Sequence, residues 1–119
     1  MEPKIPPHDL EAEKSVLAAI LIDKDAIIKV SEILKPESFY SKANSAIYEA
    51  MLELYDKRMA IDVITLKDQL TKDKKIRTVG GVSGISQLSN LLSTAANVEN
   101  YAYLIKEKRV EPYNILAVT

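Results

Sequence analysis

The spacing of the apolar residues restricts the fold more than any other feature of this chain. Apolar side chains recur at intervals of three and four residues, and an alternation of period two is nowhere sustained. The first spacing places side chains on one face of a helix, whereas alternation is typical of a half-buried strand. Only three glycines are present, which gives tight hairpin turns little support. We therefore expect an all-α fold, a single compact orthogonal bundle of about six short helices.

Residues that favour helix N-termini stand ahead of the apolar stretches and divide the chain into helices. The predicted N-caps are Asp9, Asp23, Ser41, Asp62 and Asn97. The predicted helices cover about residues 10–22, 24–34, 42–57, 63–70, 85–92 and 97–108. Pro36 ends the second helix, and a single turn after it is predicted to place Phe39 in the core. The glycines of residues 80–84 predict a turn with positive φ between the fourth and fifth helices.

Two of the predicted helices have informative faces. Apolar residues of the 42–57 helix cover two adjoining stripes, around Met51 and Tyr48, so we expect this helix to be central and packed by several others. Shared faces are predicted for Leu10, Leu17 and Leu21 in the first helix and for Val98, Tyr101, Leu104 and Ile105 in the last. Tyr103 then points away from the core, which makes it a candidate contact with a partner protein.

Few residues of this chain are suited to catalysis or metal binding. The chain has no cysteine and one histidine, His8, which lacks the partners that a metal site or a catalytic triad needs. A phosphate-binding loop of the Walker type ends in Gly-Lys-Ser or Gly-Lys-Thr, and no Gly-Lys is present. The carboxylate pairs Glu11 with Glu13 and Asp23 with Asp25 are interpreted as solvated helix caps. We expect no catalytic, cofactor-binding or metal-binding residue here.

Charge and length exclude other classes of protein. The net charge of -1 argues against a domain that mainly grips a phosphate backbone. A local excess of positive charge is nevertheless present over residues 67–77, and its candidate basic-patch residues are Lys72, Lys74, Lys75 and Arg77. The 119 residues leave no room for a second domain. The longest uncharged apolar run, residues 15–22, is too short to span a bilayer, so we expect a cytoplasmic protein without membrane contact.

Several residue strings, taken in order, resemble one family: the N-terminal domain of the bacterial DnaB-type replicative DNA helicase. The strings cover residues 6–8 with 11–17, 33–40, 61–66, 79–81 and 94–99. The resemblance extends over about residues 5–110, and the order of the strings makes it specific. It implies an all-helical collar domain over residues 1–110 that forms the N-terminal tier of a hexameric ring and docks the helicase-binding domain of primase.

The resemblance also carries expectations about the parent protein. It implies an ATP-dependent DNA helicase whose separate motor domain uses ATP and magnesium and makes most of the DNA contacts. The implied partners are primase, other helicase subunits and a helicase loader, at the replication fork on the nucleoid. This chain would then have no enzymatic activity of its own, in agreement with the absence of an ATP site.

The chain departs from the family pattern in two places. Gly84 stands where the family commonly carries an aromatic residue shortly after the paired glycines. In residues 111–119 the family continues as a basic, apolar helix, whereas here Glu111-Pro112-Tyr113 is predicted to break the helix. These nine residues are therefore interpreted as a tail that differs from the family.

The leading hypothesis is a non-catalytic interaction domain of a replicative helicase that contributes to ring assembly and recruits primase. One alternative is a stand-alone helical adaptor that borrows the helicase fold. Another is a small nucleic-acid-binding domain that uses the basic segment 67–77, whose affinity should fall steeply with added salt.

Overall fold

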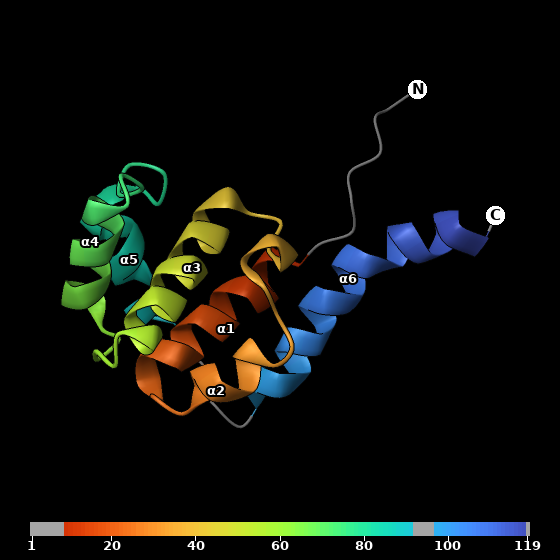
Figure 1. Ribbon diagram of the computed structural model, residues 1–119, viewed down its shortest axis with the longest axis horizontal. Helices are drawn as coiled ribbons and strands as arrows, with labels where there is room; N and C mark the ends of the chain where they lie inside the picture. Colours follow the sequence, from red (N-terminus) through yellow and green to blue (C-terminus); the bar gives the residue numbers. More distant parts are fainter. Residues whose placement is uncertain (1–8, 92–96, 119) are drawn as a thin grey trace.

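The structure is a computed structural model that describes residues 9–91 and 97–118, with side chains up to residue 108. Its helices pack around one hydrophobic core (Figure 1). Within these ranges the elements are α1 (Leu10–Ile22), α2 (Ala26–Ser31), the 3-10 turn η1 (Pro36–Ser38), α3 (Lys42–Asp56), α4 (Val63–Lys72), α5 (Gly81–Ser89) and α6 (Val98–Val118). No strand occurs among the described residues. The expected all-α bundle of six helices is confirmed.

Side-chain caps begin three helices where the sequence predicts them. The bonds run from the Ala12 amide to Asp9, from the Asn44 amide to Ser41 and from the Thr65 amide to Asp62, at 3.0, 3.2 and 2.8 Å. The Thr65 hydroxyl in turn accepts the Asp62 amide at 2.9 Å, which closes a reciprocal capping box. Each bond satisfies an amide that has no acceptor within its own helix, and so fixes the first turn.

The centre of the bundle is formed by α1 together with α3. Helix α1 packs against α2, α3, α5 and α6, and α3 packs against α1, α2, α4 and η1 (Figure 1). Seven residues of α1 are buried: Ala12, Glu13, Val16, Leu17, Ala18, Ala19 and Ile20. The prediction that α3 is packed by several elements is confirmed, but α3 shares the central place. The small alanines let neighbours approach α1 from several sides, while Leu10 is 40% exposed rather than buried.

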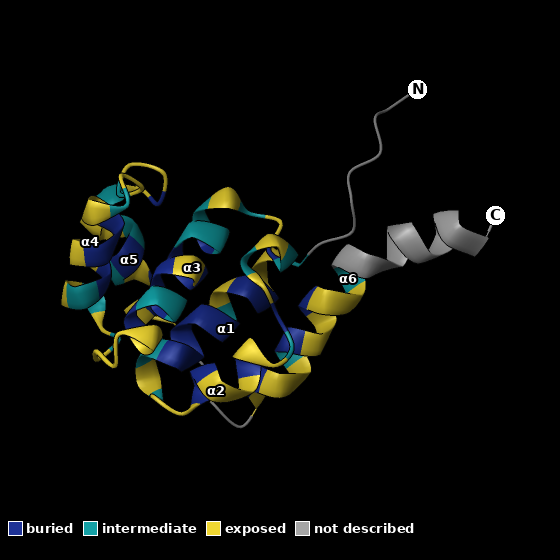
Figure 2. Ribbon diagram, viewed as in Figure 1, coloured by how far each residue is buried: buried dark blue, intermediate teal, exposed yellow. Residues whose placement is uncertain are grey.

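Aromatic side chains anchor η1 and α3 to this centre. Phe39 is buried, as predicted, and its ring lies 4.9 Å from the Tyr48 ring, centroid to centroid. The Tyr48 hydroxyl donates a hydrogen bond to the Leu34 carbonyl oxygen at 2.9 Å. Burial raises the pKa of this hydroxyl, which therefore stays protonated and continues to donate. Figure 2 shows the buried residues running through the middle of the bundle.

Helix α2 is shorter than predicted. The apolar pattern predicts residues 24–34 behind an Asp23 cap, but the helix runs from Ala26 to Ser31. The Asp23 carboxylate accepts the Asp25 amide two residues on, at 2.9 Å, and so forms a local turn. Such side-chain bonds to nearby amides compete with the helix, which delays its start.

Helix α6 differs from the prediction in length and in face. It continues to Val118, so the predicted end at residue 108 and the predicted break at residues 111–113 are wrong. A proline within a helix removes one hydrogen bond and tends to kink the helix, and it need not end it. The buried residues are Val98, Ala102 and Ile105, whereas Leu104 is 40% exposed. Here too a small alanine occupies the buried stripe where the pattern favoured leucine.

Helices α3 and α4 end in the same way, with a non-glycine residue in the left-handed region. Arg58 and Lys74 both have a φ of 60°. The amides of the residues that follow them, Met59 and Lys75, donate back to carbonyl oxygens five residues earlier at 2.9 and 2.8 Å. Glycine usually occupies this position, because a Cβ there is strained.

We expect Lys74→Gly to raise the free energy of unfolding by about 0.5 kcal/mol. The substitution relieves left-handed strain of about 1 kcal/mol, and part of this gain is offset because glycine gives the unfolded chain more freedom. Chemical denaturation with urea measures the difference. Lys67→Gly, at an exposed position inside α4, is the matched control and should cost about 1 kcal/mol. A loss of stability in Lys74→Gly would contradict the assignment of strain.

Candidate protein-interaction surface

Exposed apolar side chains on α6 form the candidate contact surface. Tyr103 is 55% exposed and the adjoining Leu104 is 40% exposed, while Ala102 and Ile105 pack into the core. Helix α6 is held in place by packing on α1 and α2 (Figure 1). The predicted outward position of Tyr103 is confirmed. A large, rigid, partly apolar ring on a fixed helix is typical of residues that contribute strongly to protein interfaces.

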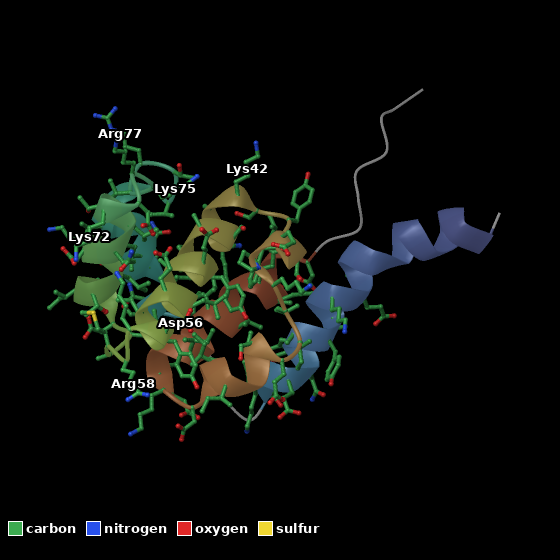
Figure 3. The ribbon with its side chains drawn as sticks, viewed as in Figure 1. Lys42, Asp56, Arg58, Lys72, Lys75 and Arg77 are labelled. Atoms are coloured by element: carbon green, nitrogen blue, oxygen red, sulfur yellow. The ribbon has the colours of Figure 1, made fainter. Side chains whose placement is uncertain are left out.

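The basic segment at the end of α4 is exposed but is mixed with acidic residues. All four candidate patch residues, Lys72, Lys74, Lys75 and Arg77, are exposed. Lys72 forms an ion pair with Asp68 at 3.0 Å one turn earlier. Figure 3 shows Lys72 and Arg77 projecting outward from the bundle. Carboxylates beside these cations reduce the attraction that a phosphate backbone would feel.

A groove of about 660 Å³ lies between α3 and the end of α4. Its lining includes two lysines and three carboxylates: Lys42, Lys75, Glu49, Glu53 and Asp73. Gln69 is only 3% exposed. Its Nε2 donates to Glu53 Oε2 at 2.9 Å and to Asp73 Oδ1 at 3.1 Å. The sequence analysis did not identify this cluster. An apolar pattern carries no signal for a buried glutamine that joins two helices.

Glu13 is the main correction to the predicted sites. It is 1% exposed rather than solvated, and its carboxylate accepts the Tyr40 amide at 2.8 Å, the Ser41 amide at 3.3 Å and the Asn44 side-chain amide at 3.0 Å. These groups belong to the N-terminal end of α3, where the helix dipole favours negative charge. Glu13 of α1 therefore caps α3 from across the fold, whereas Glu11 is exposed as predicted.

A second groove, of about 350 Å³, lies between α1, α3 and α5. Leu10 and Leu91 line it together with Lys14 and Gln87.

Among the described residues, no group of three or more histidine or acidic side chains is arranged to hold a metal ion. No helix in the same ranges is long and apolar enough to cross a membrane. Three predicted features lie outside the described residues: His8, the end of the predicted fifth helix at Leu92, and residues 94–96 of the strings that resemble the family.

The positive φ values predicted for the glycine-rich turn are observed at Gly80 and Gly81 only, because α5 begins at Gly81 rather than at residue 85 and includes Gly84. Gly80 and Gly81 have φ values of 83° and 69°. Gly84 is required for another reason, because a Cβ built on it would lie 1.8 Å from the Val79 carbonyl oxygen. The segment is therefore a close-packed entry to α5. It contains none of the lysine that a phosphate-binding loop requires.

Comparison with known proteins gives one consistent family. A family model described as the DnaB-like helicase N terminal domain matches residues 5–107. The chain is 42% identical over 107 residues to the replicative DNA helicase DnaB of Geobacillus stearothermophilus. It is 37% identical over 107 residues to the replicative DNA helicase DnaC of Bacillus subtilis. Each alignment covers 90% of this chain and 24% of the relative, so the chain spans about a quarter of the length of these helicases.

A solved structure agrees with this result. The crystal structure of the N-terminal domain of DnaB helicase from Mycobacterium tuberculosis superimposes with a TM-score of 0.88 at 37% sequence identity. The alignment covers 95% of this chain and 81% of that chain. The agreement extends over almost the whole chain, so it is a likeness of the domain and not of one motif.

Proposed function

Because the chain belongs to the family of DnaB-like helicase N-terminal domains, we propose that it serves a replicative helicase as a non-catalytic collar that helps to assemble the ring and docks primase. The exposed face of α6 around Tyr103 carries the proposal. The opposite face of α6 packs into the core, so Tyr103 lies on the outer face of a fixed helix and is not needed for packing. A tyrosine has only two χ angles, so it supplies a large contact area at a low cost in side-chain entropy on binding.

The proposed division of labour follows from the family to which the chain belongs. ATP and magnesium would be used by a motor domain of the parent helicase, which would also make most of the DNA contacts. This chain would provide protein contacts to primase, to neighbouring subunits and, in addition, to a helicase loader, in the cytoplasm at the replication fork. Six copies in a ring would raise the effective concentration of weak docking surfaces, so a single copy is expected to bind less tightly than the assembled ring.

We expect Tyr103→Ala to weaken binding of the helicase-binding domain of primase at least tenfold while leaving the melting temperature unchanged. Truncating an exposed aromatic anchor at an interface costs about 2 kcal/mol of binding free energy, whereas an exposed side chain contributes little to folding. Isothermal titration of the primase domain into each variant measures the affinity. Tyr55→Ala, which removes a 43% exposed tyrosine from α3, is the matched control and should retain binding.

The stand-alone adaptor remains the alternative within the same class of function. Both proposals require protein contacts, but an adaptor would bind an intact helicase and not primase. If primase binds Tyr103→Ala as well as the original chain, the proposed face of α6 is not the docking surface. If primase does not bind the original chain or its ring, the docking role itself fails.

A further inference from the structure

The groove between α3 and the end of α4 contains a hydrogen-bonded pair of carboxylates that the proposed function does not use. The two hydrogens of the Gln69 amide are donated to Glu53 on α3 and to Asp73 at the end of α4. One buried amide therefore holds two acidic groups from different helices side by side. When two carboxylates lie this close in a partly desolvated site, the repulsion between their negative charges disfavours ionisation of both at once.

More negative than positive groups act directly on the Glu53 carboxylate. Glu49 lies one turn earlier on α3, and Asp73 faces Glu53 from α4. Lys57 donates to the Gln69 carbonyl oxygen at 2.7 Å, so its ammonium is directed mainly at the amide. Lys42 and Lys75 stand at the exposed rim of the same groove (Figure 3). Of the other described elements packed on α3, α1, α2 and η1 contribute no residue to the lining of this groove, and Phe39, which follows η1, contributes an apolar ring.

These surroundings favour the protonated form of Glu53. Partial burial is the largest cause, followed by the hydrogen bond and repulsion from Asp73 and by repulsion from Glu49, with Lys57 acting in the opposite direction. Together they raise the pKa of Glu53 to about 7. When Glu53 carries a proton, its O–H can donate to the Asp73 carboxylate and link the two helices directly. When it is ionised, only Gln69 holds the two acceptors together.

The pair lies at a joint of the chain. Asp73 is the C-cap of α4, Lys74 is in the left-handed conformation, and the Lys75 amide donates back to Leu70. Beyond this joint the exposed basic residues lead to the turn before α5 (Figure 1). Repulsion between Glu53 and Asp73 would therefore act where α4 stops and the basic segment begins.

We propose that Glu53 and Asp73 form a proton-dependent latch that holds the end of α4, and the basic segment after it, against α3 and loosens when Glu53 ionises. The direction follows from linkage, since the folded chain holds this proton more tightly than the unfolded chain does. The stabilising contribution is complete below the ordinary pKa of a glutamate side chain. It is lost as the pH rises through about 7, the pKa of Glu53 in the folded chain.

Glu53→Gln tests the latch, because the amide retains both contacts and cannot ionise. Its carbonyl oxygen can accept from Gln69 and its NH₂ can donate to Asp73. Between pH 6 and pH 8 we expect the melting temperature of the original chain to fall by about 3 °C or more relative to that of Glu53→Gln. Asp56→Asn, which removes an exposed carboxylate from the same helix, is the control and should follow the original chain across this range.

Carbon-13 NMR of labelled glutamate carboxyl groups provides the second measurement. Glu53 is expected to titrate near pH 7, and its midpoint should fall in Asp73→Asn, which removes the repulsion. Amide exchange, expressed as protection factors, should show the end of α4 losing protection above that midpoint. A Glu53 midpoint near 4.3, the ordinary value for the side chain, would overturn the proposal. Parallel melting curves for the original chain and Glu53→Gln would do the same.

Discussion

Replacing Gly84 by alanine is expected to lower the free energy of unfolding by about 3 kcal/mol or more, which is the largest effect expected from a single methyl group in this chain. The new Cβ would lie 1.8 Å from the carbonyl oxygen and 2.9 Å from the carbonyl carbon of Val79. Both atoms belong to the backbone, so no side-chain rotation relieves the contact. Helix α5 would have to move away from Val79, which is buried.

Gly81→Ala separates this steric effect from backbone conformation. Gly81 has a φ of 69°, but a Cβ there would meet no atom within 4 Å. We expect a cost of about 1 kcal/mol, from the left-handed conformation alone. Urea denaturation of both variants gives the comparison. Equal losses would mean that the approach of Gly84 to Val79 is relaxed at little cost, and the steric account would be wrong.

Glu13→Ala is expected to cost about 3 kcal/mol, because it removes the acceptor of one buried and two partly buried donors. The donors are the Tyr40 amide, the Ser41 amide and the Asn44 side-chain amide. Two of them hold the chain where it enters α3, so the loss would loosen a helix that packs at the centre of the bundle. Thermal unfolding followed by circular dichroism measures the cost.

Two further variants define the role of Glu13. Glu13→Gln keeps an oxygen acceptor but removes the charge, so it should lose less stability than Glu13→Ala. Glu11→Ala, at an exposed position in the same first turn of α1, should cost less than about 1 kcal/mol. If Glu11→Ala and Glu13→Ala were equally damaging, a general effect of charge on the N-terminus of α1 would explain both.

The sequence predicts the helices well because their signals are local. The Asp9, Ser41 and Asp62 caps each act within three residues, so they can be recognised in a linear sequence. Errors occur where two local rules compete. Asp23 forms a turn in place of a cap, and α6 continues past the residues predicted to break it.

Buried polar residues were missed because their partners are far away in sequence. Glu13 was interpreted as a solvated cap since its neighbours favour a helix N-terminus, but its acceptors serve residues 27 to 31 positions later. Gln69 similarly donates to Glu53, 16 positions earlier on α3, in addition to Asp73 four positions later. Tyr103 was predicted correctly because the direction of a side chain depends on helical period, which the sequence shows directly.

The packing of α6 on α1 brings the two ends of the described fold together, with α1 enclosed by elements from both halves of the chain (Figure 1). During synthesis on a ribosome, α1 emerges before α6. Addition of about 85 residues at roughly 5 to 20 residues per second means that Val16 waits some 4 to 17 s before Ala102 is even made. The apolar sides of α1 must therefore remain shielded by α2 and α3, or by a chaperone, until the last helix closes the bundle.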